Sequence, residues 1–125
     1  MERYEYSYSL LRRLRLEDAE TAFQEFLAVH GEHSLAGTAQ YWLGEIYFTR
    51  SQLRKAAEIF LEGIRRYPDS RKTPDSMLKL AIVFRKLGRD EEACGMLQQL
   101  QSSFPDDSRM MHQILRSEKQ RSACG

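Results

Sequence analysis

The sequence predicts an all-α protein, a right-handed α-solenoid of three helix hairpins followed by a C-terminal capping helix. The main observation is that small residues recur every 37 positions, at Ala19, Ala56 and Ala93. Four further registers, occupied mostly by large side chains, keep the same step: Tyr6, Leu43 and Leu80; Leu10, Tyr47 and Phe84; Phe23, Phe60 and Leu97; and His30, Tyr67 and Phe104. A repeat of this length, built from two amphipathic helices, indicates a helical solenoid, and such proteins usually serve as binding surfaces.

Breaks in the helical pattern divide the chain into six helices of similar length and a shorter last one. Acidic residues favour helix starts, and glycine or proline favours helix ends. The expected ranges are about 3–15, 17–29, 35–50, 53–66, 74–87, 90–104 and 109–118. Ser34 is expected to cap the third helix, and Asp107 or Ser108 the last one. No segment alternates as a strand would, so no sheet is expected.

These helices predict a single domain with a regular internal organisation. The domain covers residues 1–118, with hairpin repeats at about 3–31, 35–68 and 72–105, a capping helix at 109–118, and a flexible tail at 119–125. In each hairpin a small residue of the first helix, Ser7, Gly44 or Ala81, is expected where the second helix crosses closely. Because glycine weakens a helix by about 1 kcal/mol relative to alanine, Gly44 is expected to have a packing reason.

Composition argues against several classes of function. The 19 basic and 18 acidic residues give a net charge of +1, without the basic excess that nucleic-acid binding requires. No apolar run of about 18 residues predicts a membrane span, and no signal peptide opens the chain, which suggests a cytosolic protein or a domain cut from a longer precursor. His30 and His33 flank a predicted turn without a third ligand, so no metal or other cofactor is expected. No phosphate loop, nucleophile elbow or CxxC motif is found, and the chain is not expected to be an enzyme.

The two cysteines do not predict a disulfide framework. Cys94 follows the repeated Ala93, and its counterpart one repeat earlier is Ala57, so it is expected to pack as a small apolar side chain. Cys124 lies in the polar tail, where it is expected only to form adventitious dimers in air.

The repeated residues resemble the tetratricopeptide pattern. The second unit matches best, through Leu43, Gly44, Tyr47, Ala56, Phe60 and Pro68, and the third keeps Leu80, Ala81, Phe84, Ala93, Leu97 and Pro105. The string AQYWLGEIYF at 39–48 is similar to the core of the C-terminal domain of the YbgF family, also called CpoB, with further similarity at 23–27, 67–70, 74–80 and 92–94. This resemblance covers residues 4–108, although the first unit has HGEH at 30–33 in place of the family's usual turn.

The resemblance to the YbgF family implies a periplasmic protein-interaction module of the Tol–Pal system. The family is implicated in binding TolA. It also links the Tol machine to a class A penicillin-binding protein and its outer-membrane activator, and so coordinates peptidoglycan synthesis with outer-membrane constriction during cell division. Family members trimerise through a coiled coil that this sequence does not contain, so a monomer or weak oligomer is expected. A scaffold of another envelope complex and a cytosolic adaptor are the alternatives.

A partner is expected in the concave groove that the first helix of each hairpin lines. The predicted groove residues are Tyr4, Tyr8, Leu11, Arg12, Tyr41, Glu45, Phe48, Leu78, Ile82 and Arg85. An aromatic and apolar stripe with few charges suits an amphipathic helix or an extended peptide. The alternative is that much of this stripe is core between helices, and Trp42 is expected to be structural. A groove for a C-terminal carboxylate is less consistent with the sequence, because tyrosine and glutamate stand at most of the positions where basic residues would be needed.

Overall fold

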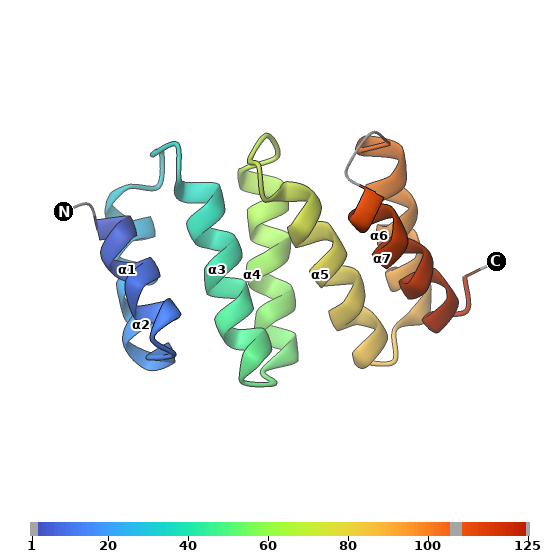
Figure 1. Ribbon diagram of the computed structural model, residues 1–125, viewed down its shortest axis with the longest axis horizontal. Coiled ribbons are helices and arrows are strands. Elements are labelled where there is room, and N and C mark those ends of the chain that lie inside the picture. Colours follow the sequence, from blue (N-terminus) through green and yellow to red (C-terminus); the bar gives the residue numbers. More distant parts are fainter. Residues whose placement is uncertain (1–2, 106–108, 125) are drawn as a thin grey trace.

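The computed structural model describes residues 3–105 and 109–124, and over these residues the chain is helical apart from its turns. The helices are α1 (Arg3–Arg12), α2 (Leu16–Val29), α3 (Ala36–Thr49), α4 (Leu53–Arg66), α5 (Thr73–Lys86), α6 (Asp90–Ser103) and α7 (Arg109–Arg121). They form hairpins that follow one another along the long axis, with the two termini at opposite ends (Figure 1). The predicted solenoid of three hairpins followed by one further helix is confirmed.

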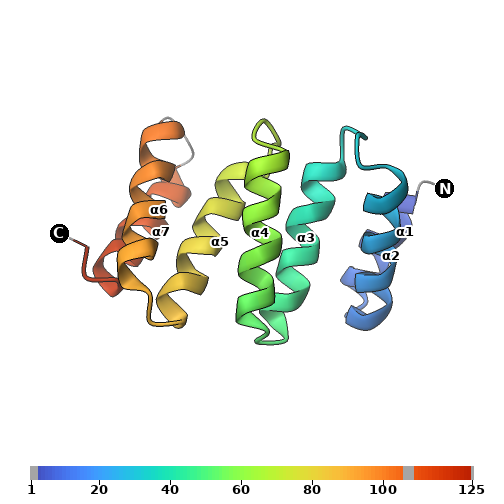
Figure 2. The same ribbon diagram turned by 180° about the vertical axis from the view of Figure 1, so that it is seen from behind.

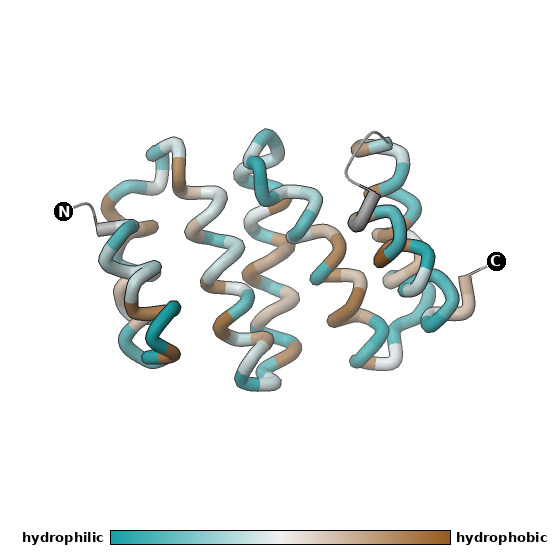
Figure 3. Tube along the Cα trace, viewed as in Figure 1, coloured by the Kyte–Doolittle hydropathy of each residue, from teal (hydrophilic) through white to brown (hydrophobic). Residues whose placement is uncertain are grey.

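The hairpins form two layers. The layer made by α1, α3, α5 and α7 is nearest the viewer in Figure 1, and the layer made by α2, α4 and α6 is nearest in Figure 2. Each hairpin packs on the next, as α3 does by contacting α2, α4 and α5. Figure 3 shows hydrophobic residues along the helices of the three hairpins, whereas the turns and most of α7 are hydrophilic.

The repeated small residues lie where helices approach most closely. Ala19, Ala56 and Ala93 are all fully buried. A Cβ atom added at Gly44 would lie 2.5 Å from Cε1 of Phe60, so only glycine lets α4 approach α3 this closely. The packing reason expected for Gly44 is therefore confirmed.

Each hairpin turns through one residue with positive φ, and these residues are also 37 positions apart. They are Leu14 (60°), Ser51 (61°) and Gly88 (79°). The amide of the following residue donates to the carbonyl oxygen five residues earlier, as Arg15 does to Leu10 at 3.0 Å, which is the Schellman pattern of a helix end. Because the chain turns at Leu14, α1 ends at Arg12 and not at the expected residue 15. Tyr6 is 53% exposed, unlike the buried residues of its register, because within the described residues no helix packs on that face of α1.

The connections between hairpins are held by side chains from both sides. The hydroxyl of Tyr67 donates to the carbonyl oxygen of Gly31 at 2.9 Å and so links the second hairpin to the first. Ser34 does not cap α3 as expected, because Leu35 precedes the helix and its amide donates to Nδ1 of His33 at 3.0 Å. The other predicted caps, Asp107 and Ser108, lie outside the described residues.

The C-terminal segment differs from its prediction. α7 continues to Arg121, and Cys124 forms a disulfide with Cys94 of α6, with Cα atoms 5.6 Å apart. The last helix therefore extends three residues beyond its predicted end at 118, and the expectation that the two cysteines do not pair is wrong. The physical reason is that Leu115 and Glu118 are both buried against the third hairpin, which brings the end of α7 back to α6.

Candidate interaction groove

The layer of first helices carries a pocket of about 440 Å³ that spans all three hairpins. We call it the aromatic pocket, and its lining residues are Tyr4, Tyr8, Leu35, Thr38, Trp42, Arg71, Lys72 and Asp75. The first two residues come from α1, the next three from the start of α3, and the last three from the start of α5 and the turn before it. A partner lying across this pocket would contact every hairpin at once.

Aromatic side chains form one wall of the aromatic pocket. The ring of Tyr8 lies 6.2 Å from that of Tyr4 and 5.4 Å from that of Trp42, measured between centroids. Nε1 of Trp42 donates to the hydroxyl of Tyr4 at 3.1 Å, so this wall joins α1 to α3. Burial raises the pKa of the Tyr4 hydroxyl, which therefore stays protonated at neutral pH.

Two basic residues line the aromatic pocket beside this wall. Nζ of Lys72 lies 5.0 Å from the ring centroids of both Tyr41 and Trp42, within the range of a cation–π interaction. Arg71 lies beside it on the same turn, and Asp75 follows one helical turn later. An aromatic wall beside basic groups suits a peptide that carries an apolar side chain next to a carboxylate.

The middle of the predicted groove is already filled by interactions within the chain. The hydroxyl of Tyr41 donates to Glu45 at 3.3 Å, and Glu45 pairs with Lys79 at 3.3 Å. Nζ of Lys79 also lies 4.5 Å from the ring centroid of Phe48. Burial, followed by the charge of Glu45, raises the pKa of Tyr41 far above its usual range. These side chains link α3 to α5 and form the floor between the two hairpins.

The structure places eight of the ten predicted groove residues in three sets, and Leu11 and Arg12 belong to none of them. Tyr4 and Tyr8 line the aromatic pocket; Tyr41, Glu45 and Phe48 are drawn together by Lys79; and Leu78, Ile82 and Arg85 lie on α5 where α7 packs. Leu11 is half-buried against the core and Arg12 is exposed at the end of α1. That these residues bind a partner remains a prediction.

Several pocket residues were not among the predicted groove residues. Trp42 is only partly buried, because one side packs on Tyr8 and Tyr41 while another side lines the pocket. The signal in the sequence that Trp42 lines this pocket was its position one helical turn after Thr38, on the same face of the helix. Arg71 and Lys72 lie in the turn between hairpins, where helical periodicity gives no information about side-chain direction.

The described residues contain no cluster of three or more histidine, cysteine, aspartate or glutamate side chains that could hold a metal ion. His30 and His33 instead pack on Phe26, with ring centroids 5.3 and 5.5 Å away. Among the described helices, none has the length and apolar character needed to cross a membrane.

Stacked helix hairpins with a groove lined by their first helices define a class of protein, the peptide- and protein-binding helical solenoids. Two family models, both described as Tetratricopeptide repeat, match residues 7–71 and 75–107. The chain belongs to the tetratricopeptide repeat family, whose repeats are protein–protein interaction modules.

Comparison with solved structures supports the same fold. The chain is similar to a crystal structure of nearly identical TPR-like repeats assigned to a kinesin light chain of Podospora anserina, with a TM-score of 0.73 and 15% sequence identity. The match covers 97% of this chain and 65% of that one, and at this identity it shows the fold alone. No curated protein sequence matches the chain.

Proposed function

We propose that this tetratricopeptide domain is a periplasmic protein-interaction module of the Tol–Pal system, that its partner is TolA, and that it helps couple peptidoglycan synthesis to outer-membrane constriction. The string AQYWLGEIYF at 39–48, similar to the YbgF core, is the observation that carries the proposal. Contact with the peptidoglycan synthase machinery follows from the same resemblance.

The disulfide supports the proposed compartment. Disulfides form and persist in oxidising environments, among which is the bacterial periplasm, and are rare in the reducing cytosol. The bond between Cys94 and Cys124 ties the segment after α7 to α6. It favours an envelope location over the cytosolic adaptor considered from the sequence.

The aromatic pocket is the proposed contact site for TolA. It joins three hairpins, offers apolar rings for burial and places Lys72 where a partner carboxylate would be attracted. A few aromatic and basic anchors of this kind usually provide most of the binding energy at an interface.

A titration with the soluble periplasmic part of TolA tests this function. Trp42 is the only tryptophan, so its fluorescence reports directly on the aromatic pocket, and calorimetry gives the affinity. Tyr8→Ala and Lys72→Ala are expected to weaken binding about fivefold or more, because loss of an interface anchor costs at least about 1 kcal/mol. Lys86→Ala, at the exposed end of α5, is the matched control and is expected to bind as the unaltered chain does. If all three variants bind TolA with the same affinity as the unaltered chain, the binding site lies elsewhere on the domain. If the unaltered chain does not bind TolA, the assignment of TolA as the partner is wrong.

Lys72 and Arg71 favour a second form of partner, a segment that ends in a free carboxylate. Two basic residues beside an apolar pocket provide the charge that the first helices alone do not. The same titration with a TolA fragment whose C-terminus is amidated distinguishes the two forms. Binding that weakens tenfold on amidation indicates an end-carboxylate, and unchanged binding indicates an internal segment.

A further inference from the structure

α7 covers an apolar surface of the third hairpin through few contacts of its own. Leu115 is 4% exposed and packs into a cluster that we call the α7 seat, formed by Met77, Leu78, Ala81, Leu97 and Leu100. The remainder of α7 is largely hydrophilic, as Figure 3 shows. The seat is therefore apolar, whereas its cover contributes only a narrow apolar stripe.

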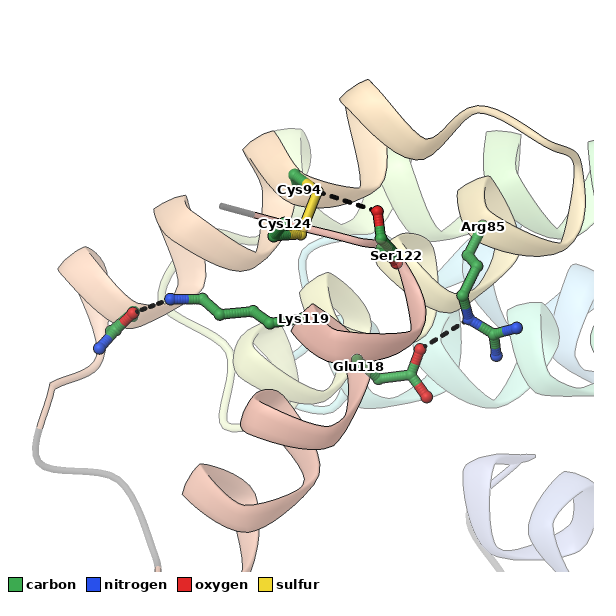
Figure 4. Close-up of a disulfide and its surroundings, with 7 residues drawn as sticks. Arg85, Cys94, Glu118, Lys119, Ser122 and Cys124 are labelled. Carbon is green, nitrogen blue, oxygen red and sulfur yellow. Dashed lines mark hydrogen bonds and ion pairs between the residues drawn. A yellow bond between two sulfur atoms is a disulfide. The ribbon is translucent and has the colours of Figure 1, made fainter.

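A carboxylate on the same face of α7 completes its docking. Glu118 follows Leu115 by three residues and is 5% exposed. Nε of Arg85 donates to Oε1 of Glu118 at 2.9 Å (Figure 4). Nη1 of Arg121 lies 3.8 Å from Oε2 of the same carboxylate. The surface around the seat thus recognises two features of a helix, a leucine and a carboxylate one turn later.

The disulfide fixes the far end of this helix. Cys124 is bonded to Cys94, and Sγ of Cys94 lies 3.6 Å from the carbonyl oxygen of Ser122, a contact without a hydrogen because a disulfide sulfur carries none (Figure 4). At its other end, α7 is joined to α6 through residues 104–108. The cover is held covalently at both ends, and only the disulfide can be released without cutting the chain.

The disulfide is accessible to a reductant. Both cysteines are partly exposed and line two open surface pockets, one of about 580 Å³ with Gln98 and Lys119 and one of about 690 Å³ with Arg89. A small dithiol can therefore approach the sulfur atoms without prior unfolding of the hairpins.

We propose that α7 is a removable cover, and that reduction of the Cys94–Cys124 disulfide exposes the α7 seat as a docking surface for an amphipathic partner helix. The partner helix would carry a leucine followed three residues later by a carboxylate, because that is the pair of groups that Leu115 and Glu118 present to the seat. This inference concerns a second surface and does not depend on the identity of the groove's partner.

The chemical step is an ordinary thiol–disulfide exchange. A dithiol reductant supplies two electrons and two protons, the Sγ–Sγ bond breaks, Cys94 and Cys124 become thiols, and the reductant leaves as its own disulfide. After reduction, α7 is held by the contacts of Leu115 and Glu118 and by its connection to α6. Its closed state is then less favoured, because the covalent closure of this segment no longer limits its conformations.

The seat extends the predicted groove. Leu78 and Arg85, both predicted groove residues, contact α7 and are available to another protein only when α7 has moved. Uncovering the seat would therefore lengthen the groove by one hairpin. The occupant that the structure shows there is a helix, which defines the class of partner.

Hydrogen exchange on the full chain tests the removable cover. On reduction with dithiothreitol, amides of α7 are expected to lose protection on the order of 100-fold, while those of α3 and α4 keep theirs. Cys94→Ser and Cys124→Ser remove the same bond from opposite sides and are expected to show this loss without reductant. Adding reductant to either variant should change nothing further. Unchanged protection of α7 in the reduced chain and both variants would overturn the proposal.

A peptide copy of α7 tests the docking surface. The probe is a labelled peptide of residues 109–121, and the receptor is the full chain with Cys124→Ser and Leu115→Ala, which weakens its own cover but leaves the seat unchanged. Saturable binding is expected to this receptor and not to the oxidised chain. A matched peptide with Glu118→Gln is expected to bind at least fivefold more weakly, because it lacks the charge that Arg85 contacts. No binding to the opened receptor, or equal binding to the oxidised chain, would overturn the docking surface.

Discussion

The interface between α2 and α3 is the first along the solenoid, and the interface between α6 and α7 is the third. The two are held by different chemistry at equivalent positions of the repeat. In the first, Glu20 of α2 pairs with Arg50 at the end of α3, with Oε1 and Nη1 2.6 Å apart. In the third, Cys94 of α6 bonds covalently to Cys124 just after α7. Glu20 and Cys94 are 74 positions apart, which is two repeats of 37, and each lies 30 residues before its partner. The backbone repeat sets where the two helices meet, and the side chains decide how they are held.

The second interface, between α4 and α5, is held in a third way at the same positions of the repeat. Ala57 and Leu87 stand where the ion pair and the disulfide stand elsewhere, and both line an open pocket of about 480 Å³ together with Leu61 and Phe84. This interface needs neither a charge pair nor a covalent bond, because α4 and α5 already pack closely over their length. α7 packs less extensively on α6, and the covalent bond lies at that weaker junction.

The difference predicts different sensitivities. The first interface contains a polar cluster in which the hydroxyl of Tyr47 donates to Glu20 at 2.5 Å, beside the ion pair with Arg50. The hydrogen bond from Tyr47, then that from Arg50, lowers the pKa of Glu20. Burial, followed by the hydrogen bond to Glu20, raises the pKa of Tyr47 to about 12. The first interface should respond to pH, and the third to reductant.

The largest expected effect comes from a matched pair of leucines. Leu43 in α3 and Leu115 in α7 are each 4% exposed, so either alanine substitution is expected to cost about 2 to 5 kcal/mol locally. Leu43→Ala should lower the stability of the whole domain, because α3 is central to it. Leu115→Ala should loosen the packing of α7, which the disulfide still tethers to α6, and leave the melting temperature of the three hairpins nearly unchanged. Thermal unfolding with hydrogen exchange measures both, and equal global losses would contradict the view of α7 as a separable cover.

The second effect is alkaline loss of stability through Tyr47. Its folded-state pKa of about 12 lies above the unfolded value of about 10, so its contribution is complete below pH 10 and is lost as the pH rises toward 12. By pH 11 the loss is expected to be roughly 1 to 2 kcal/mol. Urea unfolding at pH 9, 10 and 11 measures it, with Tyr47→Phe as the comparison. An equal slope with pH in Tyr47→Phe would assign the loss to Tyr4, Tyr41 and Tyr67, whose pKa values are also raised.

Much of the fold can be predicted from the sequence because the residues that repeat are buried. Ala56, Phe60 and their counterparts are all fully buried, so periodicity alone locates the helices and their packing. Turn residues such as Leu14 and Ser51 are less predictable. Their positive φ belongs to the turn between the two helices of one hairpin, and neither residue type indicates it.

The disulfide and the pocket were harder to predict for separate reasons. Two cysteines separated by 30 residues predict no pairing until the position of α7 is known. The available signal was that the separation of Cys94 and Cys124 equals that of Glu20 and Arg50 in the same register. The aromatic pocket depends on Lys72, whose direction is set by the turn between hairpins and not by a helical stripe.

The third effect tests the charge pair of the first interface. Because the folded-state pKa of Glu20 is lowered, its stabilisation is present above about pH 4.5 and is lost as the pH falls through the folded-state value. Glu20→Gln is expected to cost about 1 to 2 kcal/mol at pH 7, and less at pH 3. Glu25→Gln, exposed on the same helix, is the control and should change little. A loss of stability in Glu20→Gln that is the same at pH 7 and at pH 3 would contradict this view.

The smallest effects come from the turns that bring these contacts into place. Gly88 has a φ of 79° and an added Cβ would meet no other atom, so Gly88→Ala tests backbone conformation alone and is expected to cost about 1 kcal/mol. Leu14 adopts the same conformation and is 79% exposed, so Leu14→Gly is expected to stabilise by up to about 1 kcal/mol. Gly95→Ala, in the open middle of α6, should stabilise by a similar amount because it raises helix propensity. If Gly88→Ala destabilises and Gly95→Ala stabilises, the cost at Gly88 comes from the backbone conformation of the turn. The same turn, with Leu14, Ser51 or Gly88 in it, then positions the contacts compared above.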